Sequence, residues 1–543
     1  MILSAAGILY NSDERIQSFF YCDFEVHFKG LFFTSGKRAG KESIEFILSD
    51  FLSNGNIDFS SIYGNYFIYI IDKKNNKQYF FVDNSSIFKA YIYKNSISTS
   101  FIEIIDNFKD ISVENLNHSG VVEFLHFGFT YFENTLINDI YKISGNDFYV
   151  FEDDKLIKKE KGLQPINSEA QINFDQFFKD LIYAVNGLKV SLDLTGGFDS
   201  RLILSYFQKN GADFELAISG MKGNSDIEIA SKLSKIVKKE FCPTFHSLDS
   251  LNEETLKSIF INSDSQIDIL EYHRNSQLNY DRNSRGVELQ ISGVGGELYK
   301  DFWWLQDFPF YNSSKIKIEK LYNLRIESST FPHSIFEDKL KEYSLTLKSN
   351  TVNHLEKFIL GSNTETYDNI YYSYKMNTNA GVYLTIANNF FTAYAPLLEN
   401  ELVKVGFNLK RRQRFYNNFH RNKITQNSSR ISRVRTTEGI SASSFWLDKI
   451  IDIIYYVADK TKRLIKQILR KIYNITYLQE TPTNPKIYSI IKSNSVFEDH
   501  LKILKENNIL KSDLNENQIP DKLIGRILTL GCFVKRVKQN SGR

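Results

Sequence analysis

The sequence LDLTGGFDSRLIL, Leu192 to Leu204, places a polar, glycine-rich turn directly between two apolar runs. The first run is typical of a short buried strand, and residues 199–210 have the spacing of a helix closed by Gly211. A Gly-Gly turn at this point lets backbone N–H groups approach an anion without interference from Cβ atoms, and the helix adds its positive amino end. The stretch therefore predicts either a phosphate-binding turn or a tight connection in which Asp199 or Ser200 is the helix N-cap.

Strands and helices alternate on both sides of this turn. One helix is expected over residues 174–187, and another over 225–239, where Ser225 and Glu228 have the spacing of a capping box. Further strands are expected at 214–219 and 287–292. Strands separated by helices of this length imply a parallel sheet with right-handed crossovers, and ligands of such sheets bind at the carboxyl ends of the strands.

The side chains of the turn suit a phosphate ligand that is bound together with a metal ion. Thr195 and Ser200 supply hydroxyl donors for phosphate oxygens, whereas Asp199 would repel a phosphate and is therefore expected to hold a bridging Mg²⁺. The lysine of a Walker A loop is missing here. A superficially similar stretch, SGKRAGKES at 35–43, has the wrong spacing for such a loop and is expected to be a plain loop before a helix.

The first ~160 residues have the pattern of strands. Strands are expected within 24–33, 64–82 and 89–101, with a helix at 41–52, and the charged segment EDDKLIKKEKG, 152–162, is expected to mark a domain boundary. Beyond Ser314 the chain is mainly helical. Residues 448–473 have the pattern of an amphipathic, basic helix, which would lay its apolar stripe on the core or else dock on a membrane surface or a partner.

Composition narrows the classes of protein. The net charge of +3, with 24% charged residues, does not indicate a nucleic acid partner. The three cysteines are far apart and the nine histidines show no paired ligand spacing, so we expect a reducing compartment with neither a disulfide framework nor a zinc site. The sequence shows neither a secretory signal nor an uncharged apolar run of about 18 residues, which favours a cytoplasmic protein without a transmembrane segment.

Three stretches together resemble a known family. Thr195 to Ser200 resembles the SGGxDS pyrophosphate loop of the PP-loop ATP pyrophosphatases, in the setting of the asparagine synthetase branch. Ala217 to Met221, AISGM, resembles the strand end that lines adenine there, and Ile291 to Tyr299, ISGVGGELY, resembles the SGxGADE phrase near the phosphates. Segments 392–407 and 430–439 also have counterparts. The third stretch is one residue shorter than the family pattern and keeps a single acid, Glu297.

The resemblance implies a site for ATP and Mg²⁺. It assigns Asp199 and Glu297 to the metal, and Asp199, Glu297 and Arg201 to catalysis. The Arg201 guanidinium would face phosphates or an acidic substrate, or else lie on the helix surface. The basic cluster LKRRQRF, 409–415, would cap this site or be solvated. The residues that would bind ATP and pyrophosphate are Leu194, Thr195, Gly196, Gly197, Phe198, Asp199, Ser200, Ser219, Gly220, Met221, Ser292, Gly293, Gly295 and Gly296.

The N-terminal region resembles the glutaminase domain of the same family, an Ntn-hydrolase-like α+β sandwich, over residues 64–93 and 119–143. That glutaminase needs a cysteine directly after Met1 as its nucleophile, and this chain has Ile2 there. Cys22 lies in an apolar, aromatic stretch and is expected to be a buried structural thiol. The resemblance therefore implies a glutaminase-like fold without glutaminase activity at 1–160, an α/β PP-loop parallel-sheet domain at 165–440, and a helical C-terminal extension at 441–543.

The family likeness implies ATP-dependent amide-bond formation. A substrate carboxylate would be activated as an acyl-adenylate with release of pyrophosphate, and an amine would then displace AMP. The acid would be a small molecule or a peptide. The nitrogen would be ammonia, free or from a separate protein, or an amine on the substrate, as in the similar β-lactam synthetases and lasso-peptide cyclases. A homodimer is compatible with this reading, and the alternative is a non-catalytic homologue that acts as a binding or scaffold protein.

Overall fold

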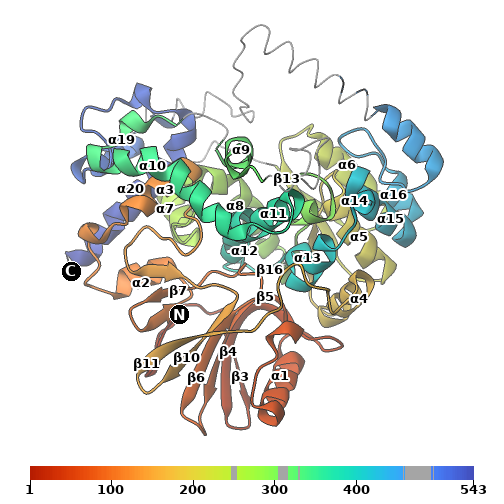
Figure 1. Ribbon diagram of the computed structural model, residues 1–543, viewed down its shortest axis with the longest axis horizontal. Coiled ribbons are helices and arrows are strands. Elements are labelled where there is room, and N and C mark those ends of the chain that lie inside the picture. Colours follow the sequence, from red (N-terminus) through yellow and green to blue (C-terminus); the bar gives the residue numbers. More distant parts are fainter. Residues whose placement is uncertain are drawn as a thin grey trace.

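The computed structural model describes residues 1–245, 253–303, 316–327, 331–455, 491–492 and 495–542, with residues 458 and 461, and gives only the backbone of residues 274 and 275. Its N-terminal part consists of two antiparallel sheets (Figure 1). The six-stranded sheet has the order β11-β10-β6-β5-β4-β3, and the five-stranded sheet has the order β2-β1-β8-β7-β9. The strands are β1 Ile2–Ser4, β2 Gly7–Tyr10, β3 Gln17–Tyr21, β4 Phe24–Phe33, β5 Tyr63–Asp72, β6 Lys77–Val82, β7 Tyr91–Tyr93, β8 Ser96–Ser98, β9 Ile140–Lys142, β10 Asp147–Glu152 and β11 Lys155–Glu160.

The two sheets face each other across a shared apolar layer. Phe67 and Tyr69 of β5 pack there with Leu3 of the five-stranded sheet, whereas Ile68 lies on the opposite face beneath helix α1 (Lys41–Asn54). Because successive side chains alternate between two buried faces, β5 reads as one continuous apolar run. The outer face of the five-stranded sheet packs against α2 (Phe101–Asn107) and α3 (His118–Phe127).

The sequence expectations for two segments of this region can be compared with the structure. The charged segment 152–162, expected to mark a domain boundary, contains strand β11, which pairs with β10 as a hairpin at the edge of the six-stranded sheet and ends at Glu160. A lysine-rich strand is a usual way to protect such an edge from further pairing. Cys22 is exposed at the turn between β3 and β4, with a φ of 51°, instead of being buried. All three cysteines are free, as expected.

The predicted parallel sheet is confirmed, with the order β14-β13-β12-β15-β16 and parallel pairing throughout. Leu192 pairs with both Leu216 and Ile291, so the carboxyl ends of β12, β13 and β15 reach the same edge. Asn224, not Ser225, caps α6. The elements are α4 Phe174–Ala184, β12 Val190–Asp193, α5 Asp199–Lys209, β13 Glu215–Gly220, α6 Ser225–Val237, β14 Phe241–Phe245, α7 Glu253–Asn262, α8 Ile269–Ser284, β15 Leu289–Ile291 and β16 Thr392–Tyr394.

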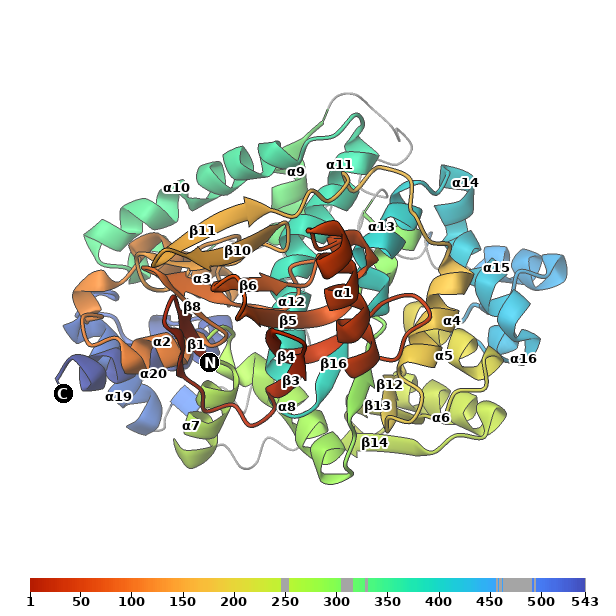
Figure 2. The ribbon, with the colours of Figure 1, turned by 90° about the horizontal axis from the view of Figure 1, so that it is seen from below.

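The rest of the described chain is mainly helical, as predicted. The C-terminal helices lie beside α2 and α3 (Figures 1 and 2), and Phe533 of α20 stacks on Phe101 of α2 with ring centroids 5.6 Å apart. One buried apolar cluster runs from the N-terminal helices through the parallel sheet to α20. The helices are α9 Ile318–Leu321, α10 Asp338–Leu355, α11 Asn363–Ile370, η8 Tyr371–Ala380 (a π-helix), α12 Gly381–Ala387, α13 Asn400–Phe407, α14 Arg411–Arg414, α15 Asn418–Asn427, α16 Ser429–Arg433, α19 Ser495–Glu506 and α20 Asp521–Ser541.

An amphipathic helix was predicted at 448–473. The structure describes a helix over residues 446–455, which contains the first part of that range. The apolar side chains of this part are exposed, so the expectation that they pack on the core is wrong for these residues. Most of the remainder of that predicted helix lies outside the described residues. Within the described part of the chain, no helix is both long enough and apolar enough to cross a bilayer.

Candidate functional site

The turn after β12 is held by hydrogen bonds from its own side chains and from α6. The Thr195 amide donates to Ser200 Oγ at 3.0 Å, and the Gly196 amide donates to Asp226 Oδ1 at 2.7 Å. Helix α5 begins at Asp199, with Phe198 as N-cap and no side-chain cap, so the predicted capping by Asp199 or Ser200 is wrong. An uncapped helix start at the carboxyl edge of a parallel sheet presents N–H groups to an anion.

The segment after β15 packs its glycines directly on this turn. A Cβ on Gly293 would lie 2.8 Å from Ser200 N, and a Cβ on Gly296 would lie 2.1 Å from Asp199 Cγ. Both distances are too short for any side chain, so only glycine allows this close approach. Gly295, between them, has a φ of +97°, in the left-handed region that favours glycine. The third sequence stretch therefore lies against the first turn of α5.

Lys300 connects the two acids of the predicted site. Its Nζ lies 2.8 Å from Asp199 Oδ2 and 3.9 Å from Glu297 Oε1. Glu297 Oε2 accepts a 2.6 Å hydrogen bond from the hydroxyl of Tyr371, the first residue of the π-helix η8. His420 Nε2, from α15, lies 2.9 Å from Asp199 Oδ1. The two predicted acids thus belong to one cluster, and π-helical turns such as η8 are often found at functional sites.

Opposite charges in this cluster stabilise each other's ionised forms. Burial alone would raise the pKa of Asp199, but Lys300 and His420 outweigh burial and hold that pKa well below its usual range. Burial would lower the pKa of Lys300, but the carboxylates of Asp199 and Glu297 raise it overall. Burial and then Glu297 raise the pKa of Tyr371 well above its ordinary value, so its hydroxyl keeps the proton that it donates. At neutral pH Asp199 is a carboxylate and Lys300 an ammonium.

Arg201 lies behind the turn. Its side chain is completely buried, and its guanidinium donates to the backbone carbonyl of Gly196 at 3.2 Å and to that of Val434. Burial lowers the pKa of Arg201 to about 10, which leaves the group charged at neutral pH. The expected alternative of a surface position is therefore wrong. The observed contacts fix the turn against the segment around Val434, and a catalytic role of Arg201 stays a prediction.

The predicted adenine-lining residues end the strand next to the turn. Ser219 and Gly220 are the last residues of β13, and Met221, directly after them, is 62% exposed. Leu194 is buried, and its amide donates to the carbonyl of Ala217 at 3.0 Å, which ties the start of the turn to β13. These residues therefore share one edge of the parallel sheet with the turn.

The segment at 430–439 covers the other side of the turn. Thr437 comes so close that a Cβ on Gly196 would lie 2.7 Å from its methyl carbon. Gly197, by contrast, has room, because its Cβ would meet only Thr195 Oγ1 at 3.4 Å. The buried ring of Phe198 faces α15, where Arg421 lies 5.5 Å from the ring centroid. The basic cluster 409–415 is only partly solvated, because Arg414 is buried and pairs with Asp368 at 2.6 Å.

The oxygen donors of the cluster fit Mg²⁺. Within the described part of the chain, Asp199 Oδ1 is buried and accepts no hydrogen bond, although His420 Nε2 lies 2.9 Å away as an ion-pair partner. Mg²⁺ prefers carboxylate oxygens and is usually held by one or two of them together with substrate phosphates. Asp199 and Glu297 supply such oxygens on either side of Lys300. A cation that bridged both acids would take the place of the Lys300 ammonium.

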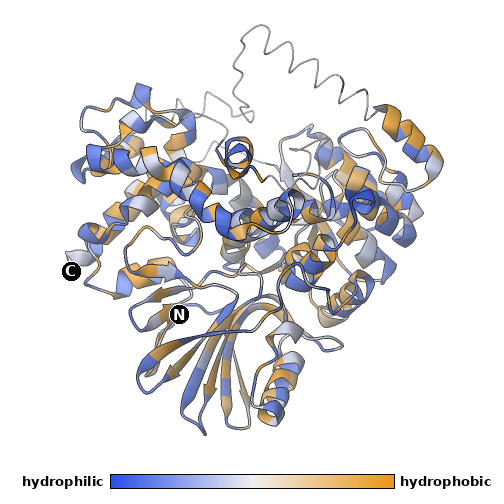
Figure 3. Ribbon diagram, in the orientation of Figure 1, coloured by the Kyte–Doolittle hydropathy of each residue, from blue (hydrophilic) through white to orange (hydrophobic). Residues whose placement is uncertain are grey.

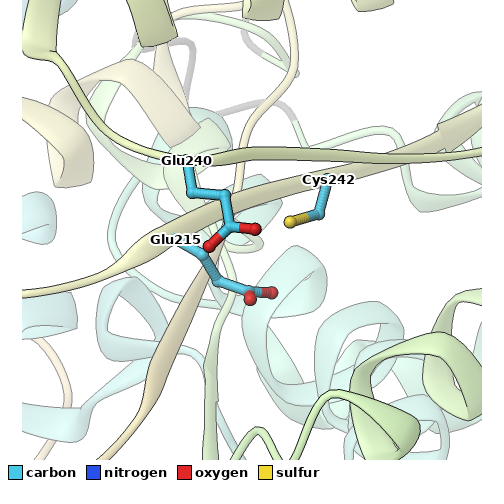
Figure 4. Close-up of side chains that lie close together, drawn as sticks. All are labelled: Glu215, Glu240 and Cys242. Atoms are coloured by element: carbon cyan, nitrogen blue, oxygen red, sulfur yellow. The ribbon is translucent and has the colours of Figure 1, made fainter.

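A second group of metal-ligand types lies at the opposite edge of the sheet. Glu215, Glu240 and Cys242 bring one ligand atom each within 4.8 Å of the others (Figure 4). Glu215 is the first residue of β13 and pairs with Arg285 at 2.7 Å. Burial raises the pKa of Cys242 to about 11, so its thiol is protonated at neutral pH and is a poor ligand. This group therefore does not compete with the Asp199 cluster as a metal site.

A cavity of about 1130 Å³ lies between the N-terminal sandwich and helices α10 and η8. Its lining includes the buried charged residues Lys89, Glu123 and Lys142, and none of the residues of the turn. The side chain of Tyr372 lines this cavity, whereas its neighbour Tyr371 points to the acid cluster. Helix η8 thus contributes to both places.

Three residues of the cluster were not foreseen from the sequence. Lys300 follows Glu297 by three residues, the spacing of one helical turn, and this signal could have revealed it. Tyr371 and His420 carry no comparable signal, because no motif surrounds them and their partners lie far away in the chain.

Comparison of the sequence with protein-family models and with curated proteins gave no significant match. Among solved structures, a glutamine-dependent NAD+ synthetase from Acinetobacter baumannii in complex with ADP matches 32% of this chain and 33% of that chain, with 18% sequence identity and a TM-score of 0.18. The match spans about a third of each chain. A likeness this weak carries no argument about fold or function.

Proposed function

We propose that this protein is an ATP-dependent, AMP-forming amide ligase of the asparagine synthetase-like kind. The observation that carries the proposal is the contact between Gly296 and Asp199, which sets the ISGVGGE segment on the TGGFDS turn. Stretches that are separated by about ninety residues, and that resemble the nucleotide site of one family, thereby meet around a single uncapped helix start. Such a meeting is expected of a nucleotide site and has no evident purpose in a plain strand–helix connection.

In this proposal, different residues of the site bind different parts of Mg·ATP. The N–H groups at the start of α5 and the hydroxyls of Thr195 and Ser200 would hold the pyrophosphate part of ATP. The end of β13 would lie beside the adenine, and the Lys300 ammonium, displaced from the two acids by Mg²⁺, would bind the phosphates. Asp199 and Glu297 would hold Mg²⁺, which would neutralise phosphate charge when bound. Arg201 would keep the turn in its shape through the carbonyls that it binds.

The proposed reaction has two steps. A carboxylate oxygen of the acid bonds to the α-phosphorus of ATP, and the bond from that phosphorus to the bridging oxygen breaks, so pyrophosphate leaves. An amine nitrogen then attacks the acyl carbon, AMP leaves with the oxygen, and the nitrogen loses a proton. The protein contributes mainly position and charge neutralisation, which are large terms in reactions of this kind.

The nitrogen in this proposal does not come from glutamine hydrolysis by this chain. Ile2 is buried in β1 and offers no nucleophile, and Cys22 lies in an exposed turn. The N-terminal sandwich would be a domain with an Ntn-hydrolase-like fold and without glutaminase activity. The acid would be a small molecule or a peptide, and the amine would be ammonia, free or from a separate protein, or a group on the substrate. Neither nucleic acid nor a transmembrane segment has a part in this proposal.

Calorimetric titration with Mg·ATP, and pyrophosphate release from ATP in the presence of a panel of acids, test the proposal. The wild-type chain should bind Mg·ATP, and Asp199→Ala should weaken binding by about tenfold or more, because it removes a carboxylate ligand from the proposed Mg²⁺ site. Asp213→Ala, which removes an exposed acid that pairs with Lys239, should bind like the wild type. If the wild-type chain neither binds Mg·ATP nor releases pyrophosphate with any acid, the scaffold alternative holds instead.

A further inference from the structure

Helix 446–455 turns its apolar face to solvent. Figure 3 shows this helix, at the right edge of the molecule, as strongly hydrophobic. At 100° per residue, its apolar positions cover an arc of about 200°, and its polar positions lie together on the remaining side. Every large apolar residue from 445 to 455 is between 42% and 68% exposed: Phe445, Trp446, Leu447, Ile450, Ile451, Ile453, Ile454 and Tyr455.

The polar side of the helix is bound to the protein. Asp452 is buried, pairs with Arg421 of α15 at 2.9 Å and accepts a 2.7 Å hydrogen bond from Ser441 Oγ. Lys449 Nζ donates to Asn418 Oδ1 at 3.0 Å. An ordinary surface helix has the reverse arrangement, with its apolar stripe on the core. The buried ion pair fixes this reversed orientation, so the exposure of the apolar arc is built into the fold.

Basic side chains flank the apolar arc. The guanidinium of Arg433 lies 5.3 Å from the ring centroid of Phe445, and that of Arg435 lies 5.0 Å from the ring centroid of Tyr455. Both arginines are exposed. Between residues 456 and 471 the sequence has six lysines and arginines and one acid, Asp459. An apolar surface with a basic surround complements an anionic lipid surface, which offers negative headgroups above an apolar interior.

The width of the apolar arc distinguishes a bilayer from a second copy of the chain. Two packed helices share a stripe of about 100°, and a paired seam is narrower still. An arc of about 200° would remain half exposed in such a pair, whereas a helix that lies in the headgroup region of a bilayer covers a wide arc at once.

We propose that helix 446–455, flanked by Arg433 and Arg435, docks this protein on the surface of an anionic lipid bilayer. The helix lies in the plane of the bilayer surface with Trp446, Ile450 and Ile454 among the side chains that enter it. The proposal concerns attachment only and does not depend on the amide ligase activity.

Co-sedimentation of the full chain with large vesicles tests this proposal. The vesicles are phosphatidylcholine with 30% phosphatidylglycerol, or phosphatidylcholine alone. The wild-type chain should sediment with the anionic vesicles, and its partition should fall several-fold with neutral vesicles or in 0.5 M NaCl. For the variant Ile450→Asn with Ile454→Asn, the partition coefficient to anionic vesicles should fall by about tenfold or more, because two large apolar side chains no longer enter the bilayer.

A matched pair of substitutions separates docking from general surface apolarity. Leu52 and Leu345 are 57% and 59% exposed and lie on other helices, so Leu52→Asn with Leu345→Asn should sediment like the wild type. Equal partition of the two double variants, or no sedimentation of the wild-type chain with anionic vesicles, would overturn the proposal. Sedimentation velocity gives the remaining outcome. The wild-type chain could be a dimer that does not sediment with vesicles, while the variant Ile450→Asn with Ile454→Asn is a monomer. In that case the helix is a contact between copies of the chain, and the proposal is wrong.

Discussion

A methyl group added at Gly296 tests the contact on which the proposed nucleotide site depends. In Gly296→Ala the new Cβ would lie 2.1 Å from Asp199 Cγ, where an ordinary contact needs 3.4 Å, so the carboxylate must move by about 1.3 Å. The φ of Gly296 is outside the left-handed region, so the change adds volume without backbone strain. A movement of this size away from Lys300 stretches their 2.8 Å ion pair to about 4 Å. The carboxylate then no longer lies where the proposal needs a Mg²⁺ ligand beside Glu297, and the loss of one charge-assisted contact in the complex costs about 3 kcal/mol of binding free energy.

This cost corresponds to binding of Mg·ATP that is about 100-fold weaker, which calorimetric titration can measure. Gly542→Ala is the matched control, because it adds the same methyl group far from the turn, at a φ of −87° and at an ordinary 3.4 Å from Lys538 O. The control should bind Mg·ATP within about twofold of the wild-type chain. Equal affinity of the two alanine variants would refute the reasoning, since it would mean that the Gly296 contact has no bearing on nucleotide binding.

Three further changes have definite expected outcomes. Lys300→Met removes the ammonium that holds down the pKa of Asp199, so the acid limb of Mg·ATP binding should move to higher pH in titrations between pH 4.5 and 7; an unchanged limb would contradict this. Burial raises the pKa of Glu399, the buried N-cap residue of α13, from 4.5 to about 8. The folded chain therefore keeps a proton that the unfolded chain releases, and stability should fall by up to about 5 kcal/mol as the pH rises from 4.5 to 8. Glu399→Gln should flatten this loss in melting temperatures measured across that range, and a parallel decline in both proteins would count against it. Ile2→Cys should not create glutamine hydrolysis, and glutamate formed by the purified variant would disprove that claim.

Local patterns in the sequence predicted elements well where both the signal and its cause are local. The strand at 24–33 and the helix after the Gly-Gly turn were foreseen because apolar periodicity and glycine closures act over a few residues. The edge strand at 155–160 was missed because nearly all of its side chains are exposed, so it lacks the apolar alternation that indicates a strand. Residues 155–160 pair with β10, and β10 pairs in turn with β6, where Phe148 faces Phe81. The charged sequence of β11 was interpreted as a domain boundary instead of a strand.

The candidate site divides in the same way. The TGGFDS, AISGM and ISGVGGE stretches are continuous in sequence, and the structure brings them to one sheet edge. His420 joins them only because α15 packs against α5, which no pattern around residue 420 indicates. The exposed helix shows a further limit. An amphipathic pattern says which residues share a face but not which face meets the protein, and here the ion pair of Asp452 with Arg421 decides.

The tight glycine contacts also set apart which pieces of chain can be changed by substitution. Gly293 and Gly296 leave no room for a side chain, so the packing of the proposed phosphate end of the site tolerates little substitution. Tyr371, the other neighbour of Glu297, belongs to η8, whose next residue lines the separate cavity. A substitution in η8 alters the surroundings of Glu297 and leaves the turn after β12 unchanged. In the proposed ligase, the phosphate contacts and the residues beside Glu297 would thus lie on different pieces of chain, so that substitutions in the second need not disturb the packing of the first.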